Sequence, residues 1–106
     1  MNLDCLKLSN MHSGNFCLNL TERVNWDKFP LFANAFVEEN EAKIVNKSQA
    51  ADMAIWEIEI NQCVLRLVYD DYPQMVSLES KDDLGNVVLE ELAAKFSIGN
   101  HRHPIK

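Results

Sequence analysis

The chain has 106 residues, of which 47% are hydrophobic and 25% are charged, and this is the composition of one ordinary globular domain. Sixteen acidic residues against ten basic ones give a formal net charge of −6, which repels nucleic-acid phosphates and anionic lipids at long range. We therefore expect a single domain over residues 1–106, with flexible ends at 1–13 and 98–106, that binds neither nucleic acid nor a membrane.

Three cysteines lie far apart in the chain, at Cys5, Cys17 and Cys63. Their odd number and their spacing fit neither a disulfide framework nor a zinc site. The first residues lack the basic and apolar regions of a secretory signal, and no apolar run reaches the roughly 18 residues that cross a bilayer. We therefore expect a cytoplasmic protein in which Cys17 and Cys63 are small buried side chains.

The N-terminal half contains several strand patterns. Residues 16–20 alternate apolar and polar side chains, which predicts a half-buried strand. Residues 3–8 are a second candidate. Residues 42–45 predict a short strand, and the polar residues 46–52 predict a loop.

A helix is predicted within residues 25–39. Its apolar residues recur at spacings of three and four: Trp26, Phe29, Phe32, Ala33, Phe36 and Val37. Pro30 fits the first turn, where its missing N–H costs no hydrogen bond, if Asp27 is the N-cap. Asn40 is expected to end the helix.

The clearest pattern is a β-hairpin. Large apolar residues alternate with other residues in two runs, 54–60 and 63–69, and Asn61-Gln62 between them has the length of a two-residue turn. With this turn, three cross-strand pairs place the large apolar residues on one face: Ile60 with Cys63, Ile58 with Leu65 and Trp56 with Leu67.

A third strand is predicted after this hairpin. Residues 70–73 have turn chemistry and predict a four-residue loop before a strand over 75–80. Such a loop places two more apolar pairs on the same face: Leu67 with Val76 and Leu65 with Leu78. The inward face therefore continues across a third strand.

A second helix is predicted to close the domain. Ser80 followed by Asp83 resembles a capping box with aspartate in place of glutamate. Apolar residues then recur every four positions: Leu84, Val88, Leu92 and Phe96. Gly85 weakens this helix by about 1 kcal/mol relative to alanine, and Gly99 marks its end region.

The order of these elements predicts an α+β domain. We expect a largely antiparallel sheet of four to six strands with two helices packed on one face. The opposite face then carries a candidate interaction surface: Ile55, Glu57, Val64, Arg66, Val68 and Met75. In this prediction Glu57 lies opposite Arg66, while Ile55, Val68 and Met75 form an apolar row. Such a row is typical of an interface with a second copy or another protein; alternatively, one end of the chain covers it.

The motifs of several enzyme classes are missing from the sequence. Its three glycines are isolated, so neither a phosphate-binding loop nor a dinucleotide fingerprint can form. The histidines His12, His101 and His103 lie outside the predicted elements, and two histidines without a third ligand make no metal site. We therefore expect no cofactor and no metal.

The adjacent carboxylates Asp70 and Asp71 are the candidates for acid–base chemistry, because close carboxylates shift each other's pKa. On this alternative the protein is a small hydrolase or isomerase. Tyr72 and Pro73 complete an ordinary turn signature beside them, which indicates that these aspartates cap their own backbone. An enzyme is therefore the less favoured interpretation, and no catalytic residue is assigned.

Residues spread over most of the chain resemble those of a known family. They are Asn25-Trp26-Asp27, Phe29-Pro30, Trp56, Leu65-Arg66-Leu67, Tyr69, Asp71 and Leu78-Glu79. Together they are similar to a group of short bacterial proteins catalogued as a domain of unknown function, over roughly Phe16 to Phe96. The resemblance implies a small bacterial cytosolic protein, and it implies no known activity, cofactor or catalytic residue.

These observations favour a non-enzymatic interaction or regulatory module. One form of such a module is an inhibitor or immunity-type protein, whose carboxylates enter the basic cleft of a nuclease by charge complementarity. A deep pocket that holds a carboxylate with a raised pKa would favour the enzyme instead.

Overall fold

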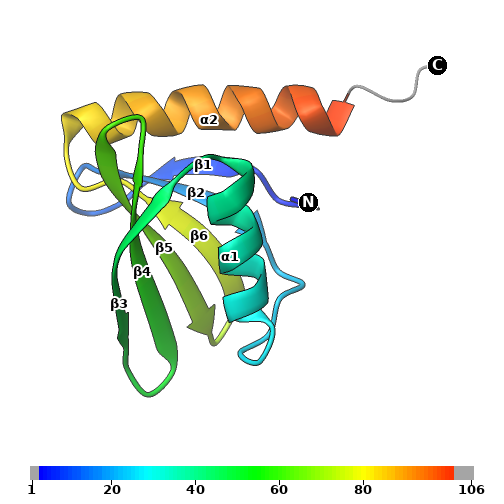
Figure 1. Ribbon diagram of the computed structural model, residues 1–106. Helices are drawn as coiled ribbons and strands as arrows, with labels where there is room; N and C mark the ends of the chain where they lie inside the picture. The colour runs from blue at the N-terminus through cyan, green and yellow to red at the C-terminus, as the bar shows by residue number, and fades with distance from the viewer. Residues whose placement is uncertain (1–2, 102–106) are drawn as a thin grey trace.

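The computed structural model describes residues 3–101, in which the chain forms six strands and two helices (Figure 1). In chain order these are β1 (Lys7–Asn10), β2 (Phe16–Thr21), α1 (Phe29–Glu39), β3 (Lys43–Gln49), β4 (Met53–Ile60), β5 (Cys63–Asp71), β6 (Gln74–Glu79) and α2 (Asp83–His101). The strands form one antiparallel sheet in the order β1-β2-β6-β5-β4-β3. This confirms the α+β fold. No described helix is long and apolar enough to cross a membrane.

The β4–β5 hairpin has the register that the alternation predicts. Its pairs include Ile60 with Cys63, Ile58 with Leu65 and Trp56 with Leu67. All of these side chains are buried. Asn61 and Gln62 form the turn, and both have a positive φ, which is the backbone of a type I′ turn.

The β5–β6 connection is shorter than predicted. Asp71 lies opposite Gln74, so the turn has two residues instead of four. Leu67 therefore lies opposite Leu78, so both expected pairs, Leu67 with Val76 and Leu65 with Leu78, are wrong. The register moves by two residues, which keeps the same side chains on the inward face because side chains alternate with a period of two.

Helix α1 begins one residue later than the N-cap at Asp27 predicts. Lys28 occupies the N-cap position, and Pro30 lies in the first turn as expected. The side chain of Asn25 caps the preceding turn, because its Oδ1 accepts a hydrogen bond of 2.9 Å from the Lys28 N–H. Asn40 ends the helix as predicted, and its Nδ2 donates to the Phe36 carbonyl at 2.9 Å.

Strand β3 is longer than predicted. Residues 46–49, expected in a loop, pair with residues 54–57 of β4, and a bulge separates Ile44 from Asn46. These residues are exposed to solvent because β3 is at the edge of the sheet. An edge strand whose side chains are mostly exposed needs no apolar alternation, and the sequence pattern therefore missed residues 46–49.

The start of α2 differs from the predicted capping box. The Oδ1 of Asp82 accepts a hydrogen bond of 2.8 Å from the Gly85 N–H and so caps the helix. Ser80 is buried, and its Oγ accepts a hydrogen bond of 2.8 Å from the Phe16 N–H of β2. The hydroxyl of Ser80 therefore joins the end of β6 to β2 and hydrogen-bonds to the Asn86 side chain of α2, and it does not cap the α2 backbone.

The face of α2 that packs on the sheet also differs from the predicted face. Leu84 is 59% exposed, whereas Leu89 is fully buried. Val88 and Leu92 are buried as expected. Gly85 lies against the sheet, and a Cβ at this position would be 2.9 Å from the Ser80 Cβ. Glycine therefore allows α2 to approach the sheet closely.

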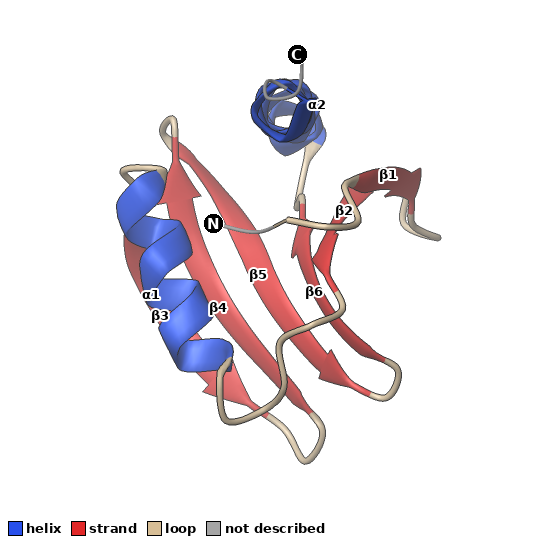
Figure 2. Cartoon of the chain, turned by 90° about the vertical axis from the view of Figure 1, so that its right-hand side faces the viewer, coloured by secondary structure: helices blue, strands red, loops and turns tan. Residues whose placement is uncertain are grey.

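Both helices pack on one face of the sheet. Figure 2 shows α1 over β3 and β4, and α2 seen end-on at one end of the sheet, where it contacts β1, β2, β5 and β6. The Phe29 ring of α1 lies 5.6 Å from the Trp56 ring of β4. The Phe36 ring of α1 lies 5.9 Å from the Phe96 ring of α2. The helices therefore share one apolar core with the sheet.

Candidate functional site: the outer face of the sheet

The side of the sheet opposite the helices is called the outer face. In the three central strands it consists of Met53, Ile55, Glu57, Glu59, Val64, Arg66, Val68, Asp70, Met75, Ser77 and Glu79. Among the described residues, neither helix lies on this face (Figure 2). The predicted surface residues therefore do share one face.

The side chains at the centre of the outer face cover one another from solvent. Val68 lies opposite Ile55 on one side and Ser77 on the other. Val68 is only 5% exposed and Ser77 only 8% exposed, although no described helix covers them. Ile55 is half-buried, and Arg66 is exposed. The centre of the face is thus apolar and tightly packed, with charged side chains beside it.

The apolar row predicted from Ile55, Val68 and Met75 is wrong in one member. Met75 lies opposite Asp70 because the β5–β6 register moves by two residues. Met53 lies opposite Asp70 from the other side. The apolar surface is therefore a pair in one row, Ile55 with Val68, and two methionines around Asp70 in the next row.

A charged row runs beside the apolar pair. Glu79, Arg66 and Glu57 lie opposite one another across β6, β5 and β4, which confirms the predicted position of Glu57 opposite Arg66. The ion pair of Glu57, however, is with Lys81, whose Nζ is 2.8 Å from the Glu57 Oε2. The hydrogen bond from Lys81 lowers the pKa of the Glu57 carboxyl.

Glu79 has the opposite electrostatic environment. Its burial raises the pKa of the carboxyl, and the charge of Arg66 opposes this change. Arg66 therefore stabilises the ionised form of Glu79 within the row. Lys81 lies outside the strands, so the alternation in the sequence gave no signal for its contribution.

Strand β2 adds polar residues to the outer face that the sequence did not assign to it. The Ser77 hydroxyl donates a hydrogen bond of 3.0 Å to the Asn19 Oδ1, and the Cys17 thiol donates to the same oxygen at 3.7 Å. Burial raises the pKa of the Cys17 thiol, so the thiol stays protonated at neutral pH. Cys63 is buried in the core as expected, whereas Cys17 was expected to be buried and is only half-buried on the outer face.

Asp70 and Asp71 lie in β5 and not in a turn. Adjacent residues of a strand point to opposite faces, so these two carboxylates do not share a site. The Tyr69 hydroxyl donates a hydrogen bond of 2.7 Å to the Asp71 Oδ1. Burial raises the pKa of Tyr69 to about 12, and Asp71 adds to this effect. The geometry of a paired-carboxylate centre is therefore missing from these residues.

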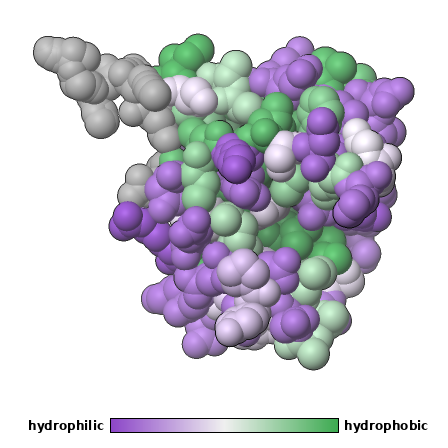
Figure 3. Space-filling model, turned by 180° about the vertical axis from the view of Figure 1, so that it is seen from behind, coloured by the Kyte–Doolittle hydropathy of each residue, from purple (hydrophilic) through white to green (hydrophobic). Residues whose placement is uncertain are grey.

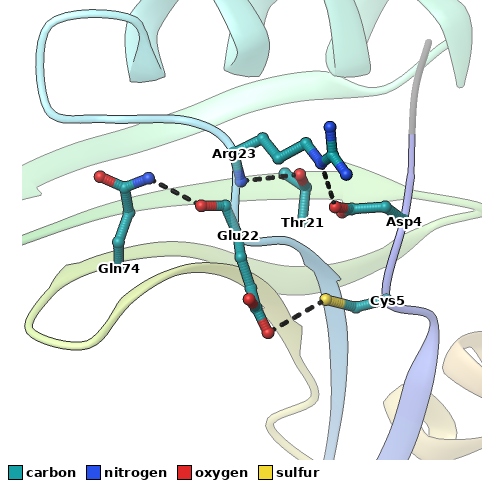
Figure 4. Close-up of polar contacts among 6 residues, drawn as sticks. All are labelled: Asp4, Cys5, Thr21, Glu22, Arg23 and Gln74. Carbon is teal, nitrogen blue, oxygen red and sulfur yellow. Dashed lines mark hydrogen bonds and ion pairs between the residues drawn. The ribbon is translucent and has the colours of Figure 1, made fainter.

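A polar cluster joins the N-terminal segment to the end of β2 and to β6 (Figure 4). Arg23 Nε lies 2.8 Å from Asp4 Oδ2. The Cys5 thiol donates to Glu22 Oε2 at 3.8 Å, and Gln74 Nε2 donates to the Glu22 carbonyl at 2.7 Å. Sequence patterns gave no signal for this cluster because its members are up to 70 positions apart. These contacts hold the N-terminal segment, the end of β2 and β6 together.

The histidines and cysteines named from the sequence lie partly within the described residues. Among the residues that the structure describes, no group of three or more histidine, cysteine, aspartate or glutamate side chains could hold a metal ion. His12 is exposed in the β1–β2 turn. The side chain of His101, and all of Arg102 and His103, lie outside the described residues.

Viewed from behind, the molecule has apolar and polar residues interspersed over its surface (Figure 3).

Comparison with known proteins identifies the family. No curated protein and no solved structure matches the chain significantly. A family model described as a protein of unknown function, DUF3630, matches residues 6–97. This match confirms the resemblance to a domain of unknown function and covers almost the whole described chain. The protein therefore belongs to the DUF3630 family.

Proposed function

We propose that this protein is a cytoplasmic, non-enzymatic interaction module that forms a homodimer through its outer face. The observation that carries the proposal is an apolar centre in which Ile55, Met53 and Met75 are partly exposed around the buried Val68, and which lacks a covering helix among the described residues. A sheet face of this kind can pack against a second sheet about 10 Å away. The three free cysteines support a reducing compartment.

The charges of the outer face favour a second copy as the partner. On the outer face of the described strands, together with Lys81, which pairs with Glu57, four side chains are acidic and four are basic: Glu57, Glu59, Asp70 and Glu79 against Lys7, Lys43, Arg66 and Lys81. The outer face is thus neutral, although the chain has a formal net charge of −6. Two copies can therefore join these faces without net repulsion in the interface, whereas a strongly basic partner would find no excess of carboxylates there.

The order of the charges also suits a symmetric dimer. The row Glu79, Arg66, Glu57 has alternating signs, with the arginine in the middle. In a two-fold interface the same patch meets itself. A copy related by a two-fold axis beside Arg66 brings each arginine close to a glutamate of the other copy, where both charges gain an opposite neighbour.

The size of the face is sufficient for a weak dimer. Strands about 4.8 Å apart and about 20 Å long give the six-stranded face an area of roughly 500 Å² per copy. Two such faces together bury about 1,000 Å², which is near the lower limit for a specific interface. We therefore expect a dissociation constant in the micromolar range.

Light scattering after size-exclusion chromatography tests this proposal over a range of protein concentrations. The unchanged protein should approach twice the mass of the chain as its concentration rises. Ile55→Lys places an unpaired charge in the interface and should raise the dissociation constant about tenfold or more. Leu84→Lys is the matched control, because Leu84 is 59% exposed on α2 and lies away from the outer face.

Two results would contradict the proposal. In one, the unchanged protein keeps the mass of a single chain at all concentrations. In the other, Ile55→Lys and Leu84→Lys dimerise equally well while circular dichroism shows that both are folded. Either result would remove the outer face as a homodimer interface.

A further inference from the structure

Strand β3 has one free edge. It pairs with β4 only, at the end of the six-stranded sheet. Its backbone N–H and C=O groups on the other side are therefore available to an additional strand. Strand addition of this kind gives a bound peptide main-chain hydrogen bonds along the edge, while its alternate side chains provide specificity.

Two features restrict which strand can add to this edge. The bulge between Ile44 and Asn46 bends the first half of β3 and leaves a regular second half, Asn46–Gln49. The charged residues of β3 are Lys43 and Lys47, both basic in a chain with a formal net charge of −6. A second β3 edge would place lysines close to lysines, so the edge disfavours self-association and favours an acidic strand.

A groove lies beside the regular half of β3. Its volume is about 380 Å³, and it is lined by Pro30, Lys47, Ser48, Gln49, Ala54 and Trp56. Pro30 at the start of α1 forms one wall, and β3 forms the other. The groove thus lies between the edge strand and a helix, next to the position of an added strand.

The groove contains one cation on an aromatic side chain. The Lys47 Nζ lies 4.2 Å from the centre of the Trp56 ring. The Phe29 ring of α1 lies 5.6 Å from the same ring, so the indole contacts both α1 and β3. Trp56 is 6% exposed, and Lys47 is exposed. The ammonium group therefore lies at the groove and can form an ion pair with the carboxylate of a ligand.

We infer that Asn46–Gln49 and the adjoining groove bind an extended acidic peptide by β-strand addition. The peptide backbone bonds to the free edge, and a carboxylate of the peptide pairs with Lys47. An inward side chain of the peptide lies beside Lys47 and Gln49, at the β3 side of the groove. This site is separate from the outer face, since Lys47 and Trp56 are on the inward side of the sheet.

The test uses the acetylated and amidated peptide Glu-Val-Glu-Val-Glu-Val, titrated into the whole ¹⁵N-labelled protein to about 2 mM, which suffices for millimolar dissociation constants. We expect shifts of the backbone amides of residues 46–49 and of the Trp56 indole N–H. Lys47→Glu should weaken binding about fivefold or more. Lys95→Glu, at an exposed lysine of α2, is the matched control and should leave binding unchanged.

Two control peptides make the inference falsifiable. An N-methylated version with the same side chains should fail to bind, and Lys-Val-Lys-Val-Lys-Val should bind more weakly. Equal binding of the N-methylated peptide would overturn strand addition, and equal binding of the lysine peptide would overturn the preference for acidic chains. Shifts confined to β1, the other edge, would overturn the assignment to β3. Retained binding by Ile55→Lys would separate this site from the proposed dimer.

Discussion

Asn61 and Gln62 show how single residues constrain the hairpin that orients the outer face. Their φ angles are 53° and 65°, in the left-handed region that costs residues with a Cβ roughly 1–2 kcal/mol. Asparagine tolerates this region better than glutamine, and glycine best of all. The register around this turn was predictable because it depends only on the length of the turn and the alternation of the strands.

We expect Gln62→Gly to stabilise the protein by about 0.5–1 kcal/mol, since relief of the left-handed backbone exceeds the added freedom of the unfolded chain. Urea denaturation followed by fluorescence measures the change. Gln49→Gly is the control, because Gln49 lies in a strand and should lose about 0.5–1 kcal/mol. A loss of stability in Gln62→Gly would contradict the strain at this turn.

At the scale of elements, α2 shows where sequence patterns become ambiguous. The helix carries two apolar stripes, one with Val88, Leu89 and Leu92 inward, and one with Leu84 and other exposed residues outward. A spacing of four fits parts of both stripes, so the pattern cannot determine which one faces the sheet. The hydrogen bonds of Ser80 and the close approach of Gly85 decide it, and both depend on distant segments.

Gly85→Ala tests this close approach. Alanine in a helix is ordinarily favoured over glycine by about 1 kcal/mol. Here the added Cβ would lie 2.9 Å from the Ser80 Cβ and 3.3 Å from the Leu65 Cδ2. These atoms belong to a buried packing contact, so α2 must shift, and we expect a net loss of about 1–3 kcal/mol.

Thermal and urea unfolding measure the effect of Gly85→Ala. Glu91→Ala, at an exposed position of the same helix, is the control and should change stability by less than about 0.5 kcal/mol. Stabilisation by Gly85→Ala would mean that α2 has room to accept a side chain at this point, against the packing described.

At the scale of the whole molecule, the placement of both helices on one face determines which residues remain outside. This placement was predictable, because the alternation in β4 and β5 separates large apolar residues from the rest. The pairing of neighbouring side chains across the outer face was less predictable. Met75 lies opposite Asp70, and not opposite Val68 as predicted, because the β5–β6 turn is two residues shorter than predicted. Lys81, which pairs with Glu57, lies outside the strands.

The edges of the sheet were the least predictable part. Both β1 and most of β3 are exposed, so solvent replaces the apolar contacts that produce a recognisable alternation. The candidate site was therefore predictable at its centre, from Ile55 to Arg66, and not at its borders. The proposed functions of the centre and of the β3 edge are independent of each other.

The central claim is that the outer face joins two copies of the chain. Isotope-filtered NOE spectra of a mixture of ¹³C-labelled and unlabelled protein, at a concentration where the dimer is populated, test this claim most directly. We predict intermolecular NOEs to the methyl groups of Ile55, Val68 and Met75. Intermolecular NOEs that arise only at Leu84, Val87 and Ile98 of α2, or a complete lack of them, would contradict it.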